Sequence, residues 1–326
     1  MAQTSIHRRT FLAAAAAGLA VRTVSAAPPD RAQIAITLDL EMSRNFPTWE
    51  TTHWDYEKGN LNAETKAYAV EAARRVKQRG GRIHFFAVGR TLEQENVDWL
   101  KRLADDGHPI GNHTYDHVNI KATRLADVQF RFQRSPWLVA GREPLDVIRE
   151  NIRLATEAMK SRLGIVPSGF RTPGGFGTAL SDREDLQKLL LDLGFTWASS
   201  KYPGHKIGAP GETPSDKVIA SIAEGVSAAQ PFKYPRGLVE VPMSPISDIG
   251  AFRTGRWKLE WFLRAIRAAV EAAIERRQAY DFLCHPSCMY VVDPECKTIE
   301  LICDLVEKAG SRAELVDLET LSKTTS

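Results

Sequence analysis

Two histidines four residues apart, His113 and His117, carry the clearest sign of chemistry in this chain of 326 residues. If the run 107–117 (GHPIGNHTYDH) forms a helical turn, both imidazoles lie on the same side of the backbone. Two imidazoles on one face suit a divalent metal such as zinc, and a third ligand would leave one position open for water. Because the chain holds eight histidines, the alternative is a chance pair on the surface.

The third ligand has a candidate at the end of an apolar run. Residues 36–41 read ITLDLE, so Asp39 and Glu41 are two positions apart. In an extended chain both side chains point to the same side. One carboxylate can then bind a metal while the other stays free as a general base. The alternative is a helix N-cap or a solvated loop that contains two acids.

Two more polar residues follow apolar runs. Arg171 comes directly after Gly169 and Phe170, and a buried guanidinium needs a partner because an unpaired buried charge is costly. A carboxylate across the same rim would satisfy it in bidentate geometry, whereas an arginine in an exposed turn would need none. His285 ends the run 282–286 (FLCHP). A lone histidine there is more often structural than catalytic, so its position in the fold decides its role.

The chain offers short β-rich runs that alternate with amphipathic helical patterns, and these elements must position the polar residues. Seven strands separated by helices favour a parallel sheet, either open or closed into a barrel. The predicted strands are 33–39, 82–88, 109–114, 168–172, 195–199, 238–242 and 280–285, and the predicted helices are 63–79, 97–106, 144–163, 182–193, 257–278 and 293–308.

The positions of the polar residues favour a barrel. Barrel enzymes assemble their active sites at the C-terminal rim from several strands, whereas an open sheet gathers only residues near its switch point. The connections 42–62, 118–143 and 200–236 fall on this rim and could shape a substrate groove. Four of the polar residues each lie at or just beyond the C-terminal end of a different predicted strand: Asp39, His113, Arg171 and His285.

Together these runs resemble the motifs of the polysaccharide deacetylases of carbohydrate esterase family four, the NodB-homology group. The similar segments occur in family order and span about 33–316. The first departs from the usual Thr-Phe-Asp-Asp because its second carboxylate is displaced by one position, as in the branch with an Asp-x-Glu form. The segments are 37–41 (TLDLE), 85–89 (FFAVG), 113–117 (HTYDH), 171–173 (RTP) and 283–285 (LCH).

The resemblance implies an irregular (β/α)7 barrel with divided roles at its rim. The metal, for which zinc is expected, would be held by Glu41, His113 and His117. The catalytic residues would be Asp39 as the base, Arg171 as its orienting partner, and His285 as the acid that protonates the departing sugar nitrogen. A main-chain N–H in the turn 173–176 is expected to stabilise the oxyanion. The expected substrate contacts are Pro173, Gly174, Trp197 and Leu283.

One residue of the family pattern is missing. The family often has an aspartate near the fifth strand that tunes the catalytic histidine, but residues 197–201 (WASSK) contain no acid. Either another carboxylate, with Asp248 as the candidate, supports His285, or main-chain groups alone hold it. Without a carboxylate partner the histidine would lose its proton more easily, and activity would fall at a lower alkaline pH.

The first 26 residues have the layout of an export signal. Arg8 and Arg9 precede Phe11 and Leu12, and residues 13–21 form a modestly apolar stretch without acids. The small residues at 24–26 (VSA) suit cleavage, and the arginine pair resembles a twin-arginine signal. A Sec signal or a disordered basic segment is the alternative. We expect a signal over 1–26, a deacetylase domain over 27–326, and a periplasmic or secreted location.

Charge and hydropathy exclude two function classes. The segment 1–26 holds three arginines and no acids, so its removal takes the formal net charge from +3 to 0. The body shows no cluster of basic residues, and nucleic-acid binding is not expected. No stretch approaches the length of a transmembrane helix.

Four cysteines lie close together in the sequence: Cys284, Cys288, Cys296 and Cys303. Their spacing matches no familiar zinc-site pattern. Disulfides in an oxidising compartment and buried free thiols are both open.

The substrate is expected to be an N-acetylated glycan of the cell envelope or the environment. Trp49, Trp54, Trp137 and Tyr202 lie in the long rim connections, where aromatic faces could pack on sugar rings. Two rival functions stay open. One is hydrolysis of small amides, as in the allantoinase-like branch of the same barrel. The other is a glycan-binding protein that has kept its metal and lost turnover.

Overall fold

The computed structural model of this protein describes residues 30–42 and 58–325. The expected export signal, Trp49 and Trp54 lie outside the described residues. None of the helices in these two ranges is long and apolar enough to cross a bilayer. All four cysteines are buried and free, so the structure has thiols where the sequence left disulfides open.

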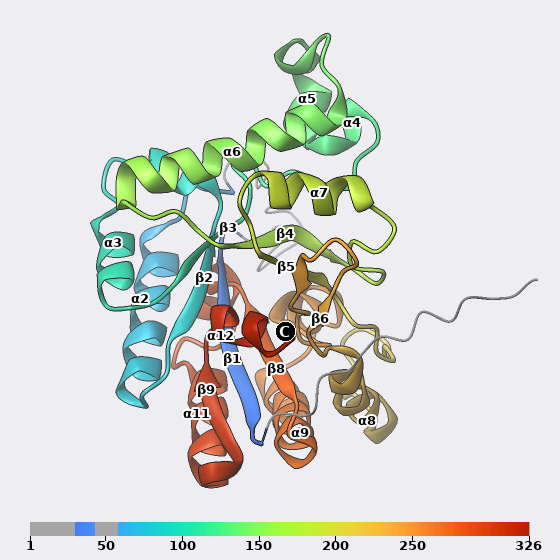
Figure 1. The fold of residues 1–326 in the computed structure, drawn as a ribbon. Helices are drawn as coiled ribbons and strands as arrows, with labels where there is room; N and C mark the ends of the chain where they lie inside the picture. The colour runs from blue at the N-terminus through green and yellow to red at the C-terminus, as the bar shows by residue number, and fades with distance from the viewer. Residues whose placement is uncertain (1–29, 43–57, 326) are drawn as a thin grey trace, which may run out of the picture.

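A curled sheet of nine strands forms the centre of the molecule (Figure 1). Its order is β6-β7-β5-β4-β3-β2-β1-β8, and β9 pairs with β1. The seven predicted strands are all present and run parallel, whereas β6 is antiparallel to β7. The strands are β1 (Ala32–Leu40), β2 (Ile83–Ala87), β3 (Ile110–Asn112), β4 (Gly169–Phe176), β5 (Trp197–Lys201), β6 (Phe232–Lys233), β7 (Val239–Glu240), β8 (Ala279–Cys284) and β9 (Ala313–Val316).

Strand β1 is central: it is buried along its whole length, and its residues are apolar except Gln33, Thr37 and Asp39. A near-continuous apolar run is typical of a strand covered on both faces in a parallel sheet. Leu38 pairs with Phe85 of β2 on one edge and with Cys284 of β8 on the other. On the same edge of β1 as β2, strand β9 pairs with the first residues of β1, and Ala35 pairs with Val316. The register of β1 with these neighbours therefore fixes the position of its C-terminal carboxylates relative to the ends of β2 and β8.

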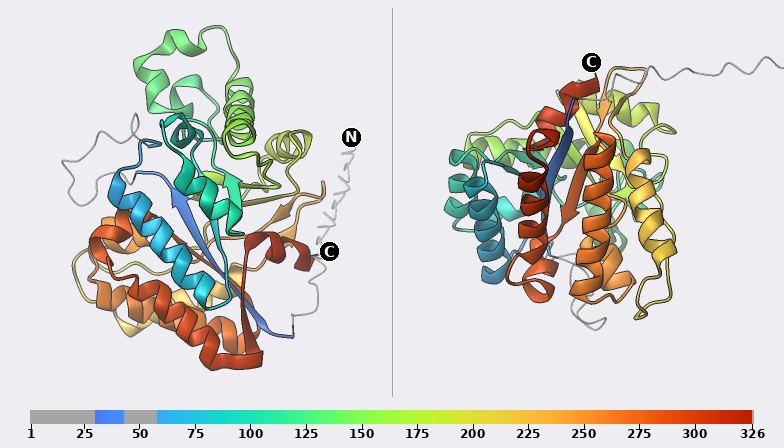
Figure 2. Two further views of the ribbon diagram at one scale, coloured as in Figure 1. Left: turned by 90° about the vertical axis from the view of Figure 1, so that its left-hand side faces the viewer. Right: turned by 90° about the horizontal axis from the view of Figure 1, so that it is seen from below.

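Helices cover the outside of the sheet, and α2, α11, α9 and α8 lie side by side around it (Figure 2). Local signals explain several ends: α6 begins at Pro144 and ends before Gly164, whose φ is 73°. The helices are α2 (Ala63–Gln78), η1 (Gly89–Glu93), α3 (Asp98–Asp105), α4 (Leu125–Val128), α5 (Phe130–Arg134), η2 (Pro136–Val139), α6 (Pro144–Leu163), α7 (Glu184–Asp192), α8 (Asp216–Gly225), η3 (Val226–Ala228), η4 (Ile249–Thr254), α9 (Leu259–Arg276), α10 (Pro286–Val292), α11 (Lys297–Ala309), η5 (Gly310–Arg312), α12 (Leu318–Ser322) and η6 (Lys323–Thr325).

The sheet curls into the irregular α/β barrel that the sequence predicted. Among the described strands, β8 does not pair with β6 or β7. A side chain bridges this opening, because Leu283 N–H donates to Ser244 Oγ at 3.4 Å. At the opposite end Leu318 and Leu321 of α12 pack against Phe86 and Trp197 inside the barrel. The long rim connections are not plain loops, since 118–143 contains α4, α5 and η2, and 200–236 contains α8, η3 and β6.

Candidate active site

Two carboxylates mark the C-terminal end of β1. Asp39 is the penultimate residue of the strand and Glu41 follows it directly. Both side chains are buried, at 5% exposure each. Because β1 lies between β2 and β8, its end is surrounded by the ends of neighbouring strands, and the carboxylates face groups from β3, β4 and β8.

The two histidines lie in a loop after β3, which corrects the expectation of a helical turn. Thr114 and His117 have φ values of 59° and 56°, in the left-handed region. Side-chain acceptors hold this backbone: Asn112 Oδ1 accepts from Thr114 N–H, and Asn151 Oδ1 accepts from the two following N–H groups, all at 2.8 Å. Such local bonds compete with helix formation. The two imidazoles still converge, with ring centroids 5.1 Å apart.

Asp116, between the two histidines, ties this loop to three other elements. Its Oδ1 accepts from Arg90 Nε at 2.9 Å and from an Arg131 guanidinium nitrogen at 3.0 Å. Its Oδ2 accepts from Asn151 Nδ2 at 3.0 Å. The loop is therefore anchored to η1, α5 and α6.

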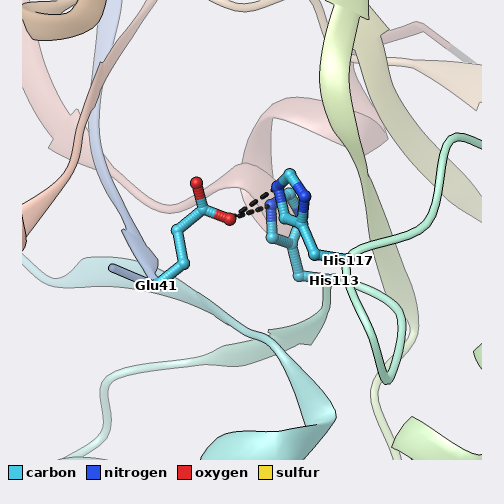
Figure 3. Close-up of side chains that lie close together, drawn as sticks. All are labelled: Glu41, His113 and His117. Carbon is cyan, nitrogen blue, oxygen red and sulfur yellow. Dashed lines mark ion pairs between the residues drawn. The ribbon is translucent and has the colours of Figure 1, made fainter. Parts of the chain in front are cut away.

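Glu41, His113 and His117 form a cluster whose ligand atoms all lie within 4.8 Å of one another (Figure 3). Glu41 Oε2 is 2.6 Å from His117 Nε2 and 3.6 Å from His113 Nε2. His113 Nδ1 lies 2.9 Å from the Arg171 carbonyl oxygen. A carbonyl only accepts, so Nδ1 carries the proton and the Nε2 lone pair points toward Glu41.

The charges of this cluster fit a divalent cation. Burial opposes ionisation of Glu41, but His117 and Lys58 hold the pKa of its carboxyl well below 4.5. Burial lowers the pKa of His117 to about 4 against the opposing effect of Glu41, and so favours the neutral ring that binds a metal. Glu41 Oε2 is buried without a hydrogen-bond partner, which is costly for an anion. Two imidazoles and one carboxylate oxygen are a common three-ligand set for catalytic zinc.

Arg171 joins two carboxylates beneath the rim. Its side chain is fully buried, and it pairs with Asp39 Oδ1 at 3.1 Å and with Asp281. Ser199 Oγ accepts from its Nε and Nη2, and its guanidinium lies 4.3 Å from the Phe86 ring centroid. The expected partner carboxylate is present. The expected bidentate geometry is wrong, because the guanidinium is shared between two acids.

Asp281 belongs to the site but lies in no recognised motif, and Thr37, the first residue of the segment 37–41, links it to Arg171. Thr37 Oγ1 donates to Asp281 Oδ1 at 2.8 Å and accepts from Arg171 Nη1 at 2.7 Å. Burial raises the pKa of Asp281 to about 6, against the opposing effect of Arg171. An acid inside the apolar run 280–285 (YDFLCH) was the signal that could have revealed it, because a buried acid needs a cation.

His285 has a carboxylate partner, which corrects the alternative of main-chain support alone. Asp248 is fully buried; its Oδ1 lies 2.9 Å from His285 Nδ1, and its Oδ2 accepts the His285 main-chain N–H at 2.8 Å. Burial alone would lower the pKa of His285, but the Asp248 carboxylate more than offsets this and raises it. The Nε2 atom faces the rim, 3.6 Å from Glu41 Oε1 and 4.0 Å from Asp39 Oδ2.

The expected substrate contacts separate into two groups. Trp197 is fully buried and donates from Nε1 to Glu319 Oε2 at 2.8 Å, toward the α12 end of the barrel. Its ring contacts Phe86, which in turn contacts the Arg171 guanidinium, so the structure exposes no face of Trp197 to a substrate. Gly174 is exposed with a φ of 73°, whereas Pro173 and Leu283 are buried near the rim.

Comparison with known proteins finds a family model that matches part of this chain and solved structures with a similar fold. A profile of the family described as Polysaccharide deacetylase matches residues 54–196. No curated protein matches the chain. A solved structure from Mycobacterium smegmatis, described as a polysaccharide deacetylase, has 15% identity, covers 92% of both chains and has a TM-score of 0.59. Another with this description, from Pseudomonas aeruginosa PAO1, has 13% identity, covers 90% of both chains and has a TM-score of 0.60. These likenesses confirm the predicted fold.

Proposed function

Because a profile of the polysaccharide deacetylase family matches residues 54–196, we propose that this chain belongs to that family and removes N-linked acetyl groups from a carbohydrate in a metal-dependent reaction. Such a reaction would make the chain a hydrolase that acts on carbon–nitrogen bonds, and the family match supports this proposal. The observation that carries the proposal is the convergence of three metal-ligating atoms beside a carboxylate and a histidine that each have a charged partner.

Glu41, His113 and His117 are the proposed ligands of the cation, with zinc as the proposed metal. When bound there, the cation would polarise the acyl carbonyl and lower the pKa of the attacking water. Asp39 accepts the proton of that water. Its Oδ1 is held by Arg171, and its Oδ2 lies 3.8 Å from His113 Nε2, so the free oxygen faces the cluster.

His285 protonates the sugar nitrogen as the carbon–nitrogen bond breaks, since an unprotonated amine is a poor leaving group. Asp248 supports this role in two ways: it holds Nδ1–H, which leaves Nε2 directed at the rim, and it favours the protonated ring. A main-chain N–H of the turn 173–176 is the proposed oxyanion donor. Trp137, 71% exposed in η2, is a proposed platform for a sugar ring.

We expect the purified protein to release acetate from N-acetylated chitooligosaccharides after zinc is supplied, and not to open allantoin. The matched control is Asp39→Asn, which should bind zinc and release little acetate. Acetate can be measured by a coupled enzymatic assay, with metal content measured in the same samples. Hydrolysis of allantoin would favour the small-amide alternative. Glycan binding without any acetate release would favour the non-catalytic one. The family match favours neither.

We also propose export through the twin-arginine route, with a signal over 1–26 and the enzyme domain over 27–326. The support is sequence alone: Arg8 and Arg9 precede an apolar stretch without acids. Replacing both arginines by lysine should keep the folded protein in the cytoplasm. Fractionation and immunoblotting measure this, with Arg22→Lys as the control in the same segment. Unchanged export of the double variant would indicate the Sec route.

A further inference from the structure

A buried lysine lies against the proposed metal ligands. Lys58 is 4% exposed, and its Nζ donates to Glu41 Oε1. The main chain around it is held in place: Met42 N–H donates to Lys58 O at 2.9 Å. A Cβ at Gly59 would come within 2.4 Å of Arg90 Cβ, so the turn packs directly against η1. The base of the Lys58 side chain is therefore fixed beside Glu41.

The two carboxylate oxygens of Glu41 have different neighbours. Oε1 pairs with Lys58 and lies 3.6 Å from His285 Nε2. Oε2 faces His117 and His113 and makes no hydrogen bond. A cation can therefore bind at Oε2 while Oε1 stays paired with the ammonium group.

The ion pair between Lys58 and Glu41 stabilises the site when no metal is bound and opposes the binding of a metal. A buried charge is costly unless an opposite charge compensates it, and the Lys58 and Glu41 side chains are only 6% and 5% exposed. In the metal-free protein Lys58 compensates the buried charge of Glu41. A divalent cation at Oε2 would bind the same carboxylate as the Lys58 ammonium group. The two positive groups would repel each other, and a poorly solvated site screens this repulsion little.

We propose that Lys58 is a built-in counter-cation of Glu41 that stabilises the metal-free site and weakens its affinity for the divalent metal. This inference rests on the proposed function, because it concerns the same site. With Lys58 neutralising Glu41, the ligands and their nearest cation contribute no net charge. More of the positive charge of the metal then acts on the acyl oxygen of the substrate.

The test compares Lys58→Met with the unchanged full chain after removal of metal by a chelator. The zinc dissociation constant, measured by competition with a chromophoric chelator, should be at least about tenfold lower in the variant. The metal-free variant should unfold at a lower temperature, so that zinc raises its Tm by more than it raises the Tm of the unchanged protein. Lys58→Arg keeps the charge and should bind zinc as the unchanged protein does.

The matched control is Lys101→Met, which removes an exposed lysine that pairs with Asp105 at 3.4 Å on α3. It should change neither quantity. Equal or weaker zinc binding by Lys58→Met overturns the proposal. If that variant does not fold without metal, Lys58→Gln is judged by the same two quantities. A different result would contradict the proposed function. In that case the unchanged protein would bind no zinc, or His117→Ala would bind zinc as well as the unchanged protein does.

Discussion

Asp39→Asn is expected to lower kcat by about a hundred- to ten-thousandfold, the usual scale for loss of a general base, while zinc content stays at one per chain. The amide keeps an oxygen that can accept from Arg171, which pairs with Asp39 Oδ1 at 3.1 Å. It cannot take a proton from the attacking water. Circular dichroism checks the fold, and kcat is measured with saturating zinc.

Glu41→Gln is the matched variant, because it makes the same carboxylate-to-amide change two positions along the chain. We expect it to lose most of its zinc on dialysis, since Glu41 Oε2 lies toward both histidines and an amide oxygen is a poorer zinc ligand. Added zinc should restore part of its activity and none of that of Asp39→Asn. Loss of zinc from Asp39→Asn with retention in Glu41→Gln would reverse the two roles.

Most of the scaffold of this site could be predicted because it depends on local pattern. The run before Asp39 is mostly apolar, and such a run is typical of a buried strand in a parallel sheet that is covered on both faces. The C-terminal ends of parallel strands meet at one rim, so the site residues on or just after four strands could be placed together before any contact was known. Strands β6 and β9, of two and four residues, were not predicted.

The charged partners could not be predicted in the same way, although Asp248 was named as the candidate partner of His285. Arg171 and Asp281 are 110 positions apart, and His285 and Asp248 are 37 apart, so their pairing depends on how the barrel curls. Lys58 belongs to no motif and reaches Glu41 only because its turn packs against η1. The prediction of a helical turn at His113 and His117 was wrong for a related reason. Asn151 on α6 supplies acceptors to that loop, and the sequence of the loop itself does not show them.

His285→Ala is expected to lower turnover by about a hundredfold or more and to leave zinc bound, since a general acid is lost and no ligand is. The pH dependence should identify its proton. His285 is active as the acid only below its pKa, so this pKa sets the alkaline limb of kcat/KM. Because Asp248 raises the pKa of His285, the unchanged enzyme keeps activity to a higher pH than the acid-free fifth strand alone would suggest.

Asp248→Asn should therefore shift the alkaline limb of kcat/KM to lower pH, by about 1 to 3 pH units for loss of a charge in direct contact. The amide still holds the ring by a hydrogen bond, so kcat/KM below the limb should fall much less than in His285→Ala. The double variant separates a proton effect from a structural one. If Asp248 acts through His285, adding Asp248→Asn to His285→Ala leaves the remaining pH profile unchanged. A shift of the same size in the double variant would mean that the limb belongs to another group, and His285 would not be the acid.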